Sequence, residues 1–380
     1  MTTLQIPKTQ KAAVLHEVKG DYHIETDWPV TQPNELKAGE CLVKIEYSGV
    51  CHSDLHIKDA DWGPPGIMPL IGGHEAVGVV VSIGEHTRNP AVKIGDRVGL
   101  KYIAAICDIC EMCRSGHEAC CTIGITKLSH GAGIQGTFQQ YAVSYVNYVT
   151  KIPDEINSAA AAPILCAGLT VYKAIKTSGA RIGQWIAITG AGGGLGHLAV
   201  QYAIAQGLRV VAIGKSDSYP VISLAVLKFP PPDTGEKKKK LVLSLGAEKW
   251  VDFRETKDLV ADVQAATGGP GPQVAIIATG GSAEPFRQAA MYLKTTGTMV
   301  GIGVPVGTPT LDIPIGLLIG KSLRIIGTAI GDRQDADEAM VIAALGKVRT
   351  RFETRNLEDL NTVFKEMSEG RIAGRIVLKL

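Results

Sequence analysis

Residues 185–203 begin with the apolar run Trp185-Ile-Ala-Ile-Thr189, continue with Gly190-Ala-Gly-Gly-Gly-Leu-Gly196 and end with His197-Leu-Ala-Val-Gln-Tyr-Ala203. A continuous apolar run is typical of a strand buried in a parallel sheet. The residues after the glycines have a helical pattern, and a second apolar run starts at Arg209. In this order of strand, turn, helix and strand, glycines let the backbone approach a pyrophosphate at the helix N-terminus. The stretch therefore predicts a dinucleotide-binding α/β unit.

The glycine turn departs from the usual G-x-G-x-x-G pattern at one position, because Ala191 stands where the first glycine is expected. A tight turn without a ligand is the alternative. We expect the whole turn to contact the cofactor: Gly190, Ala191, Gly192, Gly193, Gly194, Leu195 and Gly196. Further apolar runs separated by helical segments predict a doubly wound parallel sheet that ends near Gly327: 250–253, 274–278, 298–302 and 322–326.

Residues 214–232 do not fit this pattern. The second strand should end in an acidic residue that binds the adenosine ribose, but it ends at Gly214-Lys215, and Asp233 is the acidic residue that opens the next helix. Omitting about 19 residues, Gly214–Pro232, restores the order strand, Asp, Gly. Gly-Lys-Ser and Pro-Asp can also be encoded with intron donor and acceptor sequences. We therefore hypothesise a retained in-frame intron or a gene-model error, with a genuine family insertion as the alternative.

The same segment bears on cofactor choice. If Asp233 reaches the strand end, NAD is preferred. If Gly214-Lys215 occupies the ribose site instead, no carboxylate is present to repel the 2′-phosphate of NADP, and NADP becomes an alternative cofactor. Lys238, in a lysine run that is most simply a solvated helix face, is a further candidate for holding the ribose. An isoform with impaired cofactor binding is a third reading.

The N-terminal part of the chain has a different sequence pattern. Short alternating runs punctuated by Gly and Pro lie at residues 12–50, 76–81 and 96–100, and they predict an irregular β-barrel-like domain. We expect this domain to span residues 1–168, a coenzyme domain to span 169–327, and residues 328–380 to return to the first domain. A cysteine-rich lobe, 105–122, protrudes from the first domain.

That lobe has the spacing C-x2-C-x2-C-x7-C. The pattern can place four thiolates around one ion in a closed structural zinc site, formed by Cys107, Cys110, Cys113 and Cys121. A disulfide ladder is the alternative, which the cysteine-poor remainder of the chain disfavours. The adjacent Cys120 could compete for the fourth position.

A second candidate metal site lies in Cys51-His-Ser-Asp-Leu-His56 and Gly72-Gly-His-Glu75. A thiolate and an imidazole suit zinc, and a catalytic zinc needs a third protein ligand and an open position. Cys166 in Pro163-Ile-Leu-Cys166 is the best candidate for the third ligand, with Cys51 and His74 as the others. A buried free cysteine and an ordinary loop histidine are the alternative.

Charge and terminal composition exclude other classes of function. The net charge of +2 implies no nucleic-acid or anionic-membrane partner. The first residues, Met1–Pro7, have neither an apolar signal core nor an Arg-rich pattern, so we expect a cytoplasmic protein. No apolar run is long enough to predict a membrane span.

Together, the Cys51–His56 and Gly72–Glu75 motifs, the four-cysteine lobe, Ala162-Pro-Ile-Leu-Cys-Ala-Gly168 and the glycine turn resemble zinc-containing medium-chain alcohol dehydrogenases, in particular the tetrameric fungal enzymes of yeast type. The resemblance implies a GroES-like catalytic domain, a Rossmann coenzyme domain, two zinc ions per chain and a homotetramer. It also implies reversible hydride transfer between a small primary alcohol, such as ethanol, and NAD to give the aldehyde.

The resemblance also implies roles for individual residues. Catalytic zinc would lie on Cys51, His74 and Cys166, with Glu75 as an alternate ligand and Asp54 orienting His74. Ser53 would take the alcohol proton and His56 would pass it to solvent. The remaining implied contacts are with the cofactor, from His52, Ile302, Gly303, Val304 and Arg375, and with the substrate, from the bulky Trp62 and Tyr102.

Two rival classes stay open at this point. One is a reductase of the same fold, either without zinc or preferring NADP. The other is a protein that binds NAD or zinc without turnover, or an isoform that the segment 214–232 has inactivated. Metal content distinguishes the zinc-free reductase, and turnover distinguishes the inactive protein.

Overall fold

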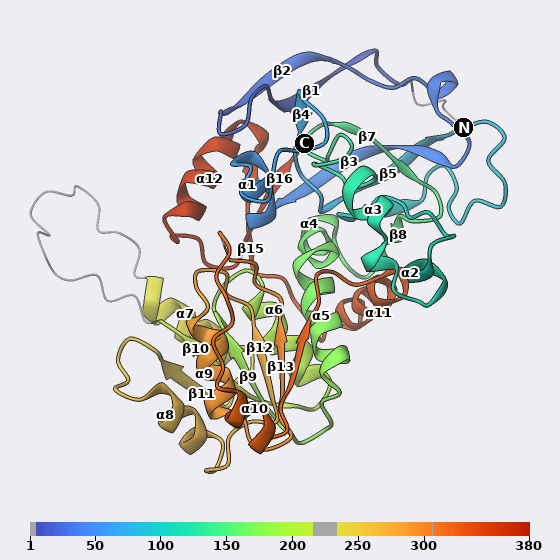
Figure 1. Cartoon of the computed structure of the whole chain (residues 1–380). Helices are drawn as coiled ribbons and strands as arrows, with labels where there is room; N and C mark the ends of the chain where they lie inside the picture. Colours follow the sequence, from blue (N-terminus) through green and yellow to red (C-terminus); the bar gives the residue numbers. More distant parts are fainter. Residues whose placement is uncertain (1–4, 216–233, 306) are drawn as a thin grey trace, which may run out of the picture. The chain divides into compact units, whose positions relative to one another are not determined.

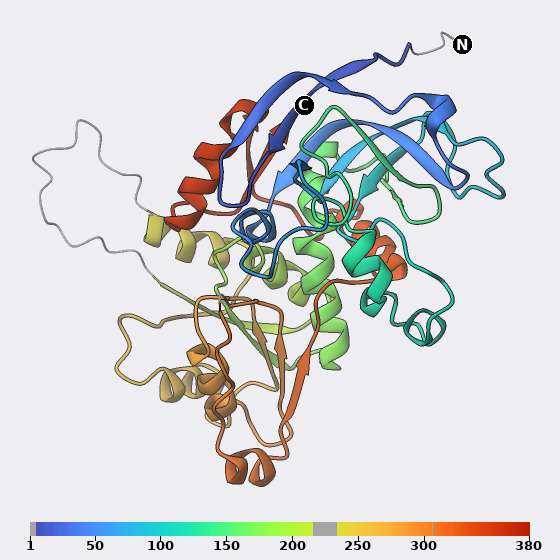
Figure 2. The same cartoon turned by 45° about the horizontal axis from the view of Figure 1, so that its top comes forward.

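The computed structural model describes residues 5–215, 234–305 and 307–380 (Figures 1 and 2). The chain divides into two compact units. Unit 1 comprises Met1–Leu169 and Ile330–Leu380, and unit 2 comprises Thr170–Ala329. Among the described helices, none is by itself both long and apolar enough to cross a bilayer, although the bent pair Ser158–Leu165 and Ala167–Ser178 together passes that test.

Unit 2 is built on a parallel sheet whose strand order is β11-β10-β9-β12-β13-β14 (Figure 1). The order reverses at β9, as in a doubly wound dinucleotide-binding sheet. Every residue of β9 is buried, because β9 pairs with β10 on one side and with β12 on the other. The described strands are β9 (Trp185–Thr189), β10 (Arg209–Gly214), β11 (Lys249–Asp252), β12 (Val274–Ile277), β13 (Thr298–Gly301) and β14 (Arg324–Gly327). The predicted α/β class is confirmed.

Helices connect these strands and pack on the sheet. α6 packs on β9 and β10, α8 on β11, and α9 on β12 and β13. The described helices are α5 (Ala167–Ser178), α6 (Gly196–Ala205), α7 (Thr234–Ser244), α8 (Leu259–Ala266), α9 (Glu284–Tyr292) and α10 (Ile315–Gly320). α7 is the helix expected after Asp233, but Asp233 itself and residues 216–232 lie outside the described residues.

The described residues of unit 1 form two sheets. The larger has the order β15-β16-β3-β5-β6-β8, with β7 also paired to β3, and the smaller has the order β2-β1-β4. The chain returns to this unit through β16, which pairs antiparallel with β3. The strands are β1 (Thr9–Leu15), β2 (Tyr22–Pro29), β3 (Glu40–Val50), β4 (Leu70–Ile71), β5 (Ala76–Ile83), β6 (Arg97–Leu100), β7 (Tyr141–Tyr145), β8 (Thr150–Lys151), β15 (Phe352–Asn356) and β16 (Arg375–Lys379).

The helices of unit 1 are short except near its C-terminal end. They are η1 (Pro33–Glu35), α1 (His52–Lys58), α2 (Glu111–Arg114), η2 (Glu118–Cys120), α3 (Thr122–Lys127), α4 (Ser158–Ala161), η3 (Ala162–Leu165), α11 (Arg333–Ala344), η4 (Leu357–Asp359) and α12 (Leu360–Ser368). α12 packs its buried face, which includes Val363 and Phe364, into a core with Tyr22, Phe138 and β1. Phe138 also lies against the loop before His74, because a Cβ atom on Gly73 would come within 2.7 Å of the Phe138 ring.

Candidate functional site

Asp54 connects the start of α1 to the predicted ligand His74. Cys51 is the N-cap of α1 and has extended backbone angles (φ −116°, ψ 156°). Its N–H donates to Asp54 Oδ2 at 2.9 Å, which forms half of a capping box. Asp54 Oδ1 accepts from His74 Nδ1 at 2.8 Å and from the Gly73 N–H at 3.2 Å. The buried carboxylate therefore fixes the helix start and the imidazole orientation together, and it leaves His74 Nε2 as the nitrogen that can bind a metal.

The residues predicted to bind catalytic zinc lie together. Ligand atoms of Cys51, His74, Glu75 and Cys166 all lie within 4.8 Å of one another. Cys166 Sγ is 3.9 Å from Cys51 Sγ and 3.2 Å from His74 Nε2. Cys166 follows η3 at the end of a buried segment, and both cysteines are free thiols. Two sulfurs and one imidazole nitrogen form a donor set that fits a catalytic zinc ion.

The surrounding groups act differently on the members of this ligand group: the hydrogen bond with Cys51 and burial raise the pKa of Cys166 well above its ordinary value. The hydrogen bond with Cys166 and the nearby Arg375 guanidinium lower the pKa of Cys51 well below its ordinary value, although burial opposes the shift. Burial disfavours the charged form of His74, but the Asp54 carboxylate raises the pKa of His74 above its ordinary value. A buried thiolate held close to a cation is a state in which a cysteine binds a metal.

Glu75 and Arg375 form a buried ion pair beside the ligand group. Arg375 Nη1 also lies 4.0 Å from Cys51 Sγ. Burial raises the pKa of Glu75 to about 7, against the effect of Arg375. Within the described part of the chain, Glu75 Oε2 has no hydrogen-bond partner. An unpartnered carboxylate oxygen among metal-ligating atoms fits an alternate ligand. The ion pair is a feature that the sequence did not indicate, because its two residues are 300 positions apart.

α1 also carries the residues predicted to move the proton. Ser53 Oγ lies 3.7 Å from Cys51 Sγ. The His56 imidazole lies 2.7 Å from the Asp61 carboxylate, and its side chain is only 14% exposed, so it is more covered than the sequence suggested. His52 is exposed, with its ring centroid 6.2 Å from that of His56. Of the predicted bulky residues, Tyr102 packs edge-on against His74 at 5.4 Å and Trp62 packs against His56 at 4.9 Å.

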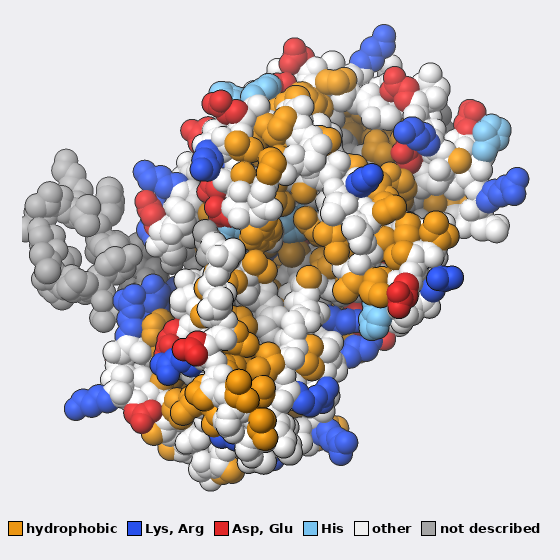
Figure 3. All heavy atoms as spheres, viewed as in Figure 1, with side chains coloured by type: hydrophobic (Ala, Val, Ile, Leu, Met, Phe, Trp, Pro, Cys, Tyr) orange, Lys and Arg blue, Asp and Glu red, His pale blue; other side chains and the backbone are white. Residues whose placement is uncertain are grey.

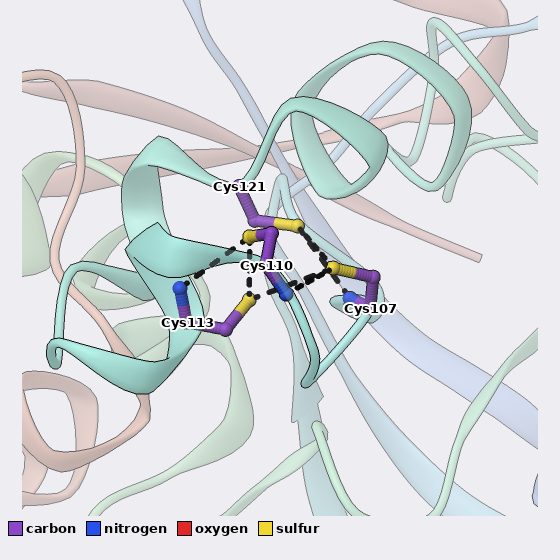
Figure 4. A group of neighbouring side chains, drawn as sticks. All are labelled: Cys107, Cys110, Cys113 and Cys121. Carbon is purple, nitrogen blue, oxygen red and sulfur yellow. Dashed lines mark hydrogen bonds between the residues drawn. The ribbon is translucent and has the colours of Figure 1, made fainter.

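The four lobe cysteines form a second compact group (Figure 4). Their sulfurs lie within 4.8 Å of one another, for example 3.4 Å between Cys110 and Cys113 and 3.7 Å between Cys107 and Cys121. Backbone N–H groups point at the sulfurs, and those of Ile109 and Cys110 lower the pKa of Cys107 to about 6. The geometry fits a closed four-thiolate zinc site.

Cys121 and not Cys120 completes this group, which settles the ambiguity in the sequence. Cys121 is fully buried and its sulfur accepts from the Gly124 N–H at 3.4 Å, whereas Cys120 is exposed. Arg333, at the start of α11, contacts acidic side chains of the lobe. It pairs with Glu118 and approaches Asp108 at 3.7 Å. The lobe is therefore attached to the helix through which the chain re-enters unit 1.

In unit 2, the glycine turn lies between the carboxyl end of β9 and the start of α6. Gly190 has a φ of +63°, a left-handed conformation that favours glycine. At Gly196, a Cβ atom would lie 2.2 Å from the Gly190 carbonyl oxygen, so only glycine fits this approach of helix to strand. The turn therefore has the close packing of helix on strand that a dinucleotide-binding turn requires.

The other predicted cofactor residues of unit 2 that the structure describes lie after β13 and on α7. Ile302, Gly303 and Val304 follow β13 directly, and Gly303 packs so closely on Thr279 that a Cβ atom would lie 2.3 Å from its carbonyl oxygen. Lys238 packs over Gly192 of the turn. Asp233 lies outside the described residues. At the end of β10, a Cβ atom on Gly214 would lie 2.2 Å from the Trp250 ring, so a side chain at this position requires that ring to move.

One predicted ligand of the lobe, Cys113, and the exposed Cys120 outside the ligand group allow a matched test of the structural zinc site. Cys113→Ser should reduce the zinc content from about two ions per chain to about one, and should lower the thermal unfolding temperature, because a closed site contributes directly to folding. Cys120→Ser should keep both ions and the unfolding temperature. Elemental analysis with calorimetry measures both, and an equal zinc content in the two variants would contradict the assignment.

Comparisons with known proteins agree with this geometry. The family model described as "Alcohol dehydrogenase GroES-like domain" matches residues 37–154, and the one described as "Zinc-binding dehydrogenase" matches residues 232–344. The second match begins where the unusual segment 214–232 ends. Alcohol dehydrogenase 1 of Emericella nidulans is 42% identical over 377 residues, which cover 99% of this chain and 99% of the relative. An alcohol dehydrogenase of Geobacillus stearothermophilus is 40% identical, covering 97% of this chain and 99% of the relative.

Solved structures give the same result. The alcohol dehydrogenase of the archaeon Aeropyrum pernix superposes with a TM-score of 0.81 at 28% identity, covering 97% of this chain and 100% of that chain. Acetophenone reductase from Geotrichum candidum, in complex with NAD, has a TM-score of 0.79 at 27% identity, covering 99% and 98%. The predicted resemblance is confirmed: the chain belongs to the zinc-containing medium-chain alcohol dehydrogenase family.

Proposed function

We propose that this chain catalyses reversible hydride transfer between a small primary alcohol, such as ethanol, and NAD, giving the aldehyde. The observation that supports this most directly is the convergence of Cys51 Sγ, His74 Nε2 and Cys166 Sγ, with Asp54 behind the imidazole. Relatives about 41% identical over the whole chain are named alcohol dehydrogenases. The bulky rings of Trp62 and Tyr102, against His56 and His74, suit a small substrate.

In this proposal the two ligand groups hold two zinc ions. Cys51, His74 and Cys166 hold the catalytic ion, with Glu75 as an alternate ligand, and the four lobe cysteines hold the structural ion. When bound, zinc supplies Lewis acidity toward the alcohol oxygen and the nicotinamide accepts the hydride. Asp54 keeps the proton of His74 on Nδ1, while Arg375 balances the charge of Glu75 and Cys51.

The proton of the alcohol leaves along α1. Ser53 Oγ, adjacent to the ligand group, accepts it first, and the His56 imidazole receives it next and transfers it to solvent. A histidine suits this position, because one nitrogen of the imidazole can accept a proton while the other donates one. Both residues lie on one short helix whose start Asp54 fixes, so the relay and the metal ligand Cys51 have a common support.

The cofactor is assigned to the carboxyl edge of the unit 2 sheet, with residues 169–327 as the coenzyme domain and the rest of the chain as the catalytic domain. The turn from Gly190 to Gly196 takes the pyrophosphate and Ile302–Val304 lines the nicotinamide, while Lys238 and Asp233 are assigned to the ribose. By the family resemblance alone, His52 and Arg375 are further candidates for contacts with the cofactor. These assignments follow the family pattern at the positions where the sequence matches it.

Turnover measurements test the substrate and the cofactor together. The purified chain should oxidise ethanol with NAD at a kcat/KM at least about tenfold above that with NADP. A variant lacking residues 214–232 joins Ile213 to Asp233, so its preference for NAD should increase. Cys166→Ser, which lacks a ligand of the catalytic zinc, is the inactive control. Absence of turnover with any small alcohol at full zinc content would refute the substrate, and a preference for NADP would refute the cofactor.

We also propose that the enzyme is a cytoplasmic homotetramer without nucleic-acid or membrane partners. β14 is the last strand of the unit 2 sheet, and the neighbouring α10 exposes Ile315 (73%) and Ile319 (71%). Figure 3 shows hydrophobic side chains gathered over α10. An apolar helix, together with a strand whose outer edge pairs with no other described strand, suits burial against another subunit.

Sedimentation velocity tests this assembly. The wild-type chain should sediment as a tetramer. The double variant Ile315→Glu, Ile319→Glu should sediment as dimers or monomers, because assembly would then bury a charged side chain of α10 at the subunit interface. Ile182→Glu changes a still more exposed isoleucine of unit 2 (85%) and is the control. A wild-type monomer would contradict the proposal.

A further inference from the structure

Asp61 lies beyond the end of α1 and contacts the proposed proton carrier His56. Asp61 Oδ2 is 2.7 Å from His56 Nδ1, with 26% and 14% of the two side chains exposed. An ionised carboxylate can only accept hydrogen bonds, so the proton of this bond belongs to Nδ1. The lone pair of the neutral imidazole therefore lies on Nε2, the nitrogen that remains available to receive a proton.

The backbone builds this contact. The Asp61 N–H donates to the His56 carbonyl at 2.9 Å and the Ala60 N–H donates to the Ile57 carbonyl at 3.1 Å. This pair of bonds is a Schellman cap, and Ala60 has the left-handed φ of +56° that the cap requires. The cap folds the chain back so that the residue after Ala60 lies over the last turn of the helix. Its usual hydrophobic contact is replaced here by the pair Asp61 and His56.

The neighbouring groups restrict the imidazole without competing for Nδ1. The Trp62 ring lies 4.9 Å from the His56 ring, tilted by 37°, and covers one side of it. His52 is a titratable group that also faces His56, with 6.2 Å between ring centroids. The second carboxylate of the cap, Asp59, pairs with Lys58 at 2.9 Å.

We propose that Asp61 is a positioning residue for alcohol oxidation, which holds His56 in the tautomer with the proton on Nδ1 so that Nε2 accepts the relayed proton. This inference rests on the proposed role of His56. A carboxylate that orients a histidine in this way acts through the tautomer and does not touch the substrate. Asp61 and His56 should therefore behave as one unit in the kinetics.

A double-mutant cycle tests the proposal in the zinc-loaded enzyme. Asp61→Ala should lower kcat for ethanol by about tenfold near pH 7, with little change in KM, because only part of the general-base contribution is lost. Asp61→Asn should lower kcat as well, because its amide N–H can donate to Nδ1 and stabilise the other tautomer, whereas Asp61→Glu keeps a carboxylate acceptor and should recover part of the rate. His56→Gln should lower kcat at least as much, and Asp61→Ala should have no further effect in that variant. Asp59→Asn is the matched control and should keep the wild-type rate.

The outcomes separate the inference from the proposed function. If His56→Gln lowers kcat but Asp61→Ala does not, the relay stands and the role of Asp61 is refuted. If Asp61→Ala lowers kcat equally with and without His56, the aspartate acts structurally and the inference fails. If His56→Gln leaves kcat unchanged over the whole pH profile, the relay and the inference fail together. Thermal unfolding of each variant checks that the fold is retained.

Discussion

The two oxygens of Asp54 fix the site around which the rest of unit 1 is arranged. One oxygen accepts the Cys51 N–H and starts α1, and the other accepts His74 Nδ1 from a loop 20 residues further along the chain. The carboxylate is buried, so these hydrogen bonds are strong and directional. Because the same group positions a thiolate and an imidazole, the distance between the two ligands follows from one side chain. Cys166 then needs only to approach from the start of α5.

α1 shows how much chemistry a short helix can position when both of its ends are fixed. The N-cap of α1 is Cys51, its second residue is Ser53, and its last turn begins at His56. Asp54 orients His74 at one end of this helix, and Asp61 orients His56 beyond the other end. Two carboxylates thus determine which nitrogen of each histidine carries a proton. The metal-binding nitrogen and the proton-accepting nitrogen are both Nε2.

The sequence was sufficient for features that depend on local pattern. The apolar run at Trp185 and the glycines after it predicted the central strand and the turn, and the cysteine spacing predicted the lobe. The sequence could not reveal the pair Glu75 and Arg375, because contacts between distant residues leave no periodic signal. The sequence analysis also missed Asp61. Its position depends on the left-handed backbone of Ala60, a conformation that the sequence does not predict for an alanine. An Asp in the turn after a helix that carries a candidate histidine is the signal that could have identified it.

The affinity of the first metal site for zinc in Asp54→Asn is the most direct test of this account. The amide cannot accept with the strength of a carboxylate, so we expect this site to lose zinc to a competing chelator at about 10- to 100-fold lower chelator concentration than in the wild type. The four-cysteine site of the same protein should be unaffected and serves as the internal reference. Equal retention of zinc at the first site in both proteins would show that Asp54 does not hold His74 for the metal.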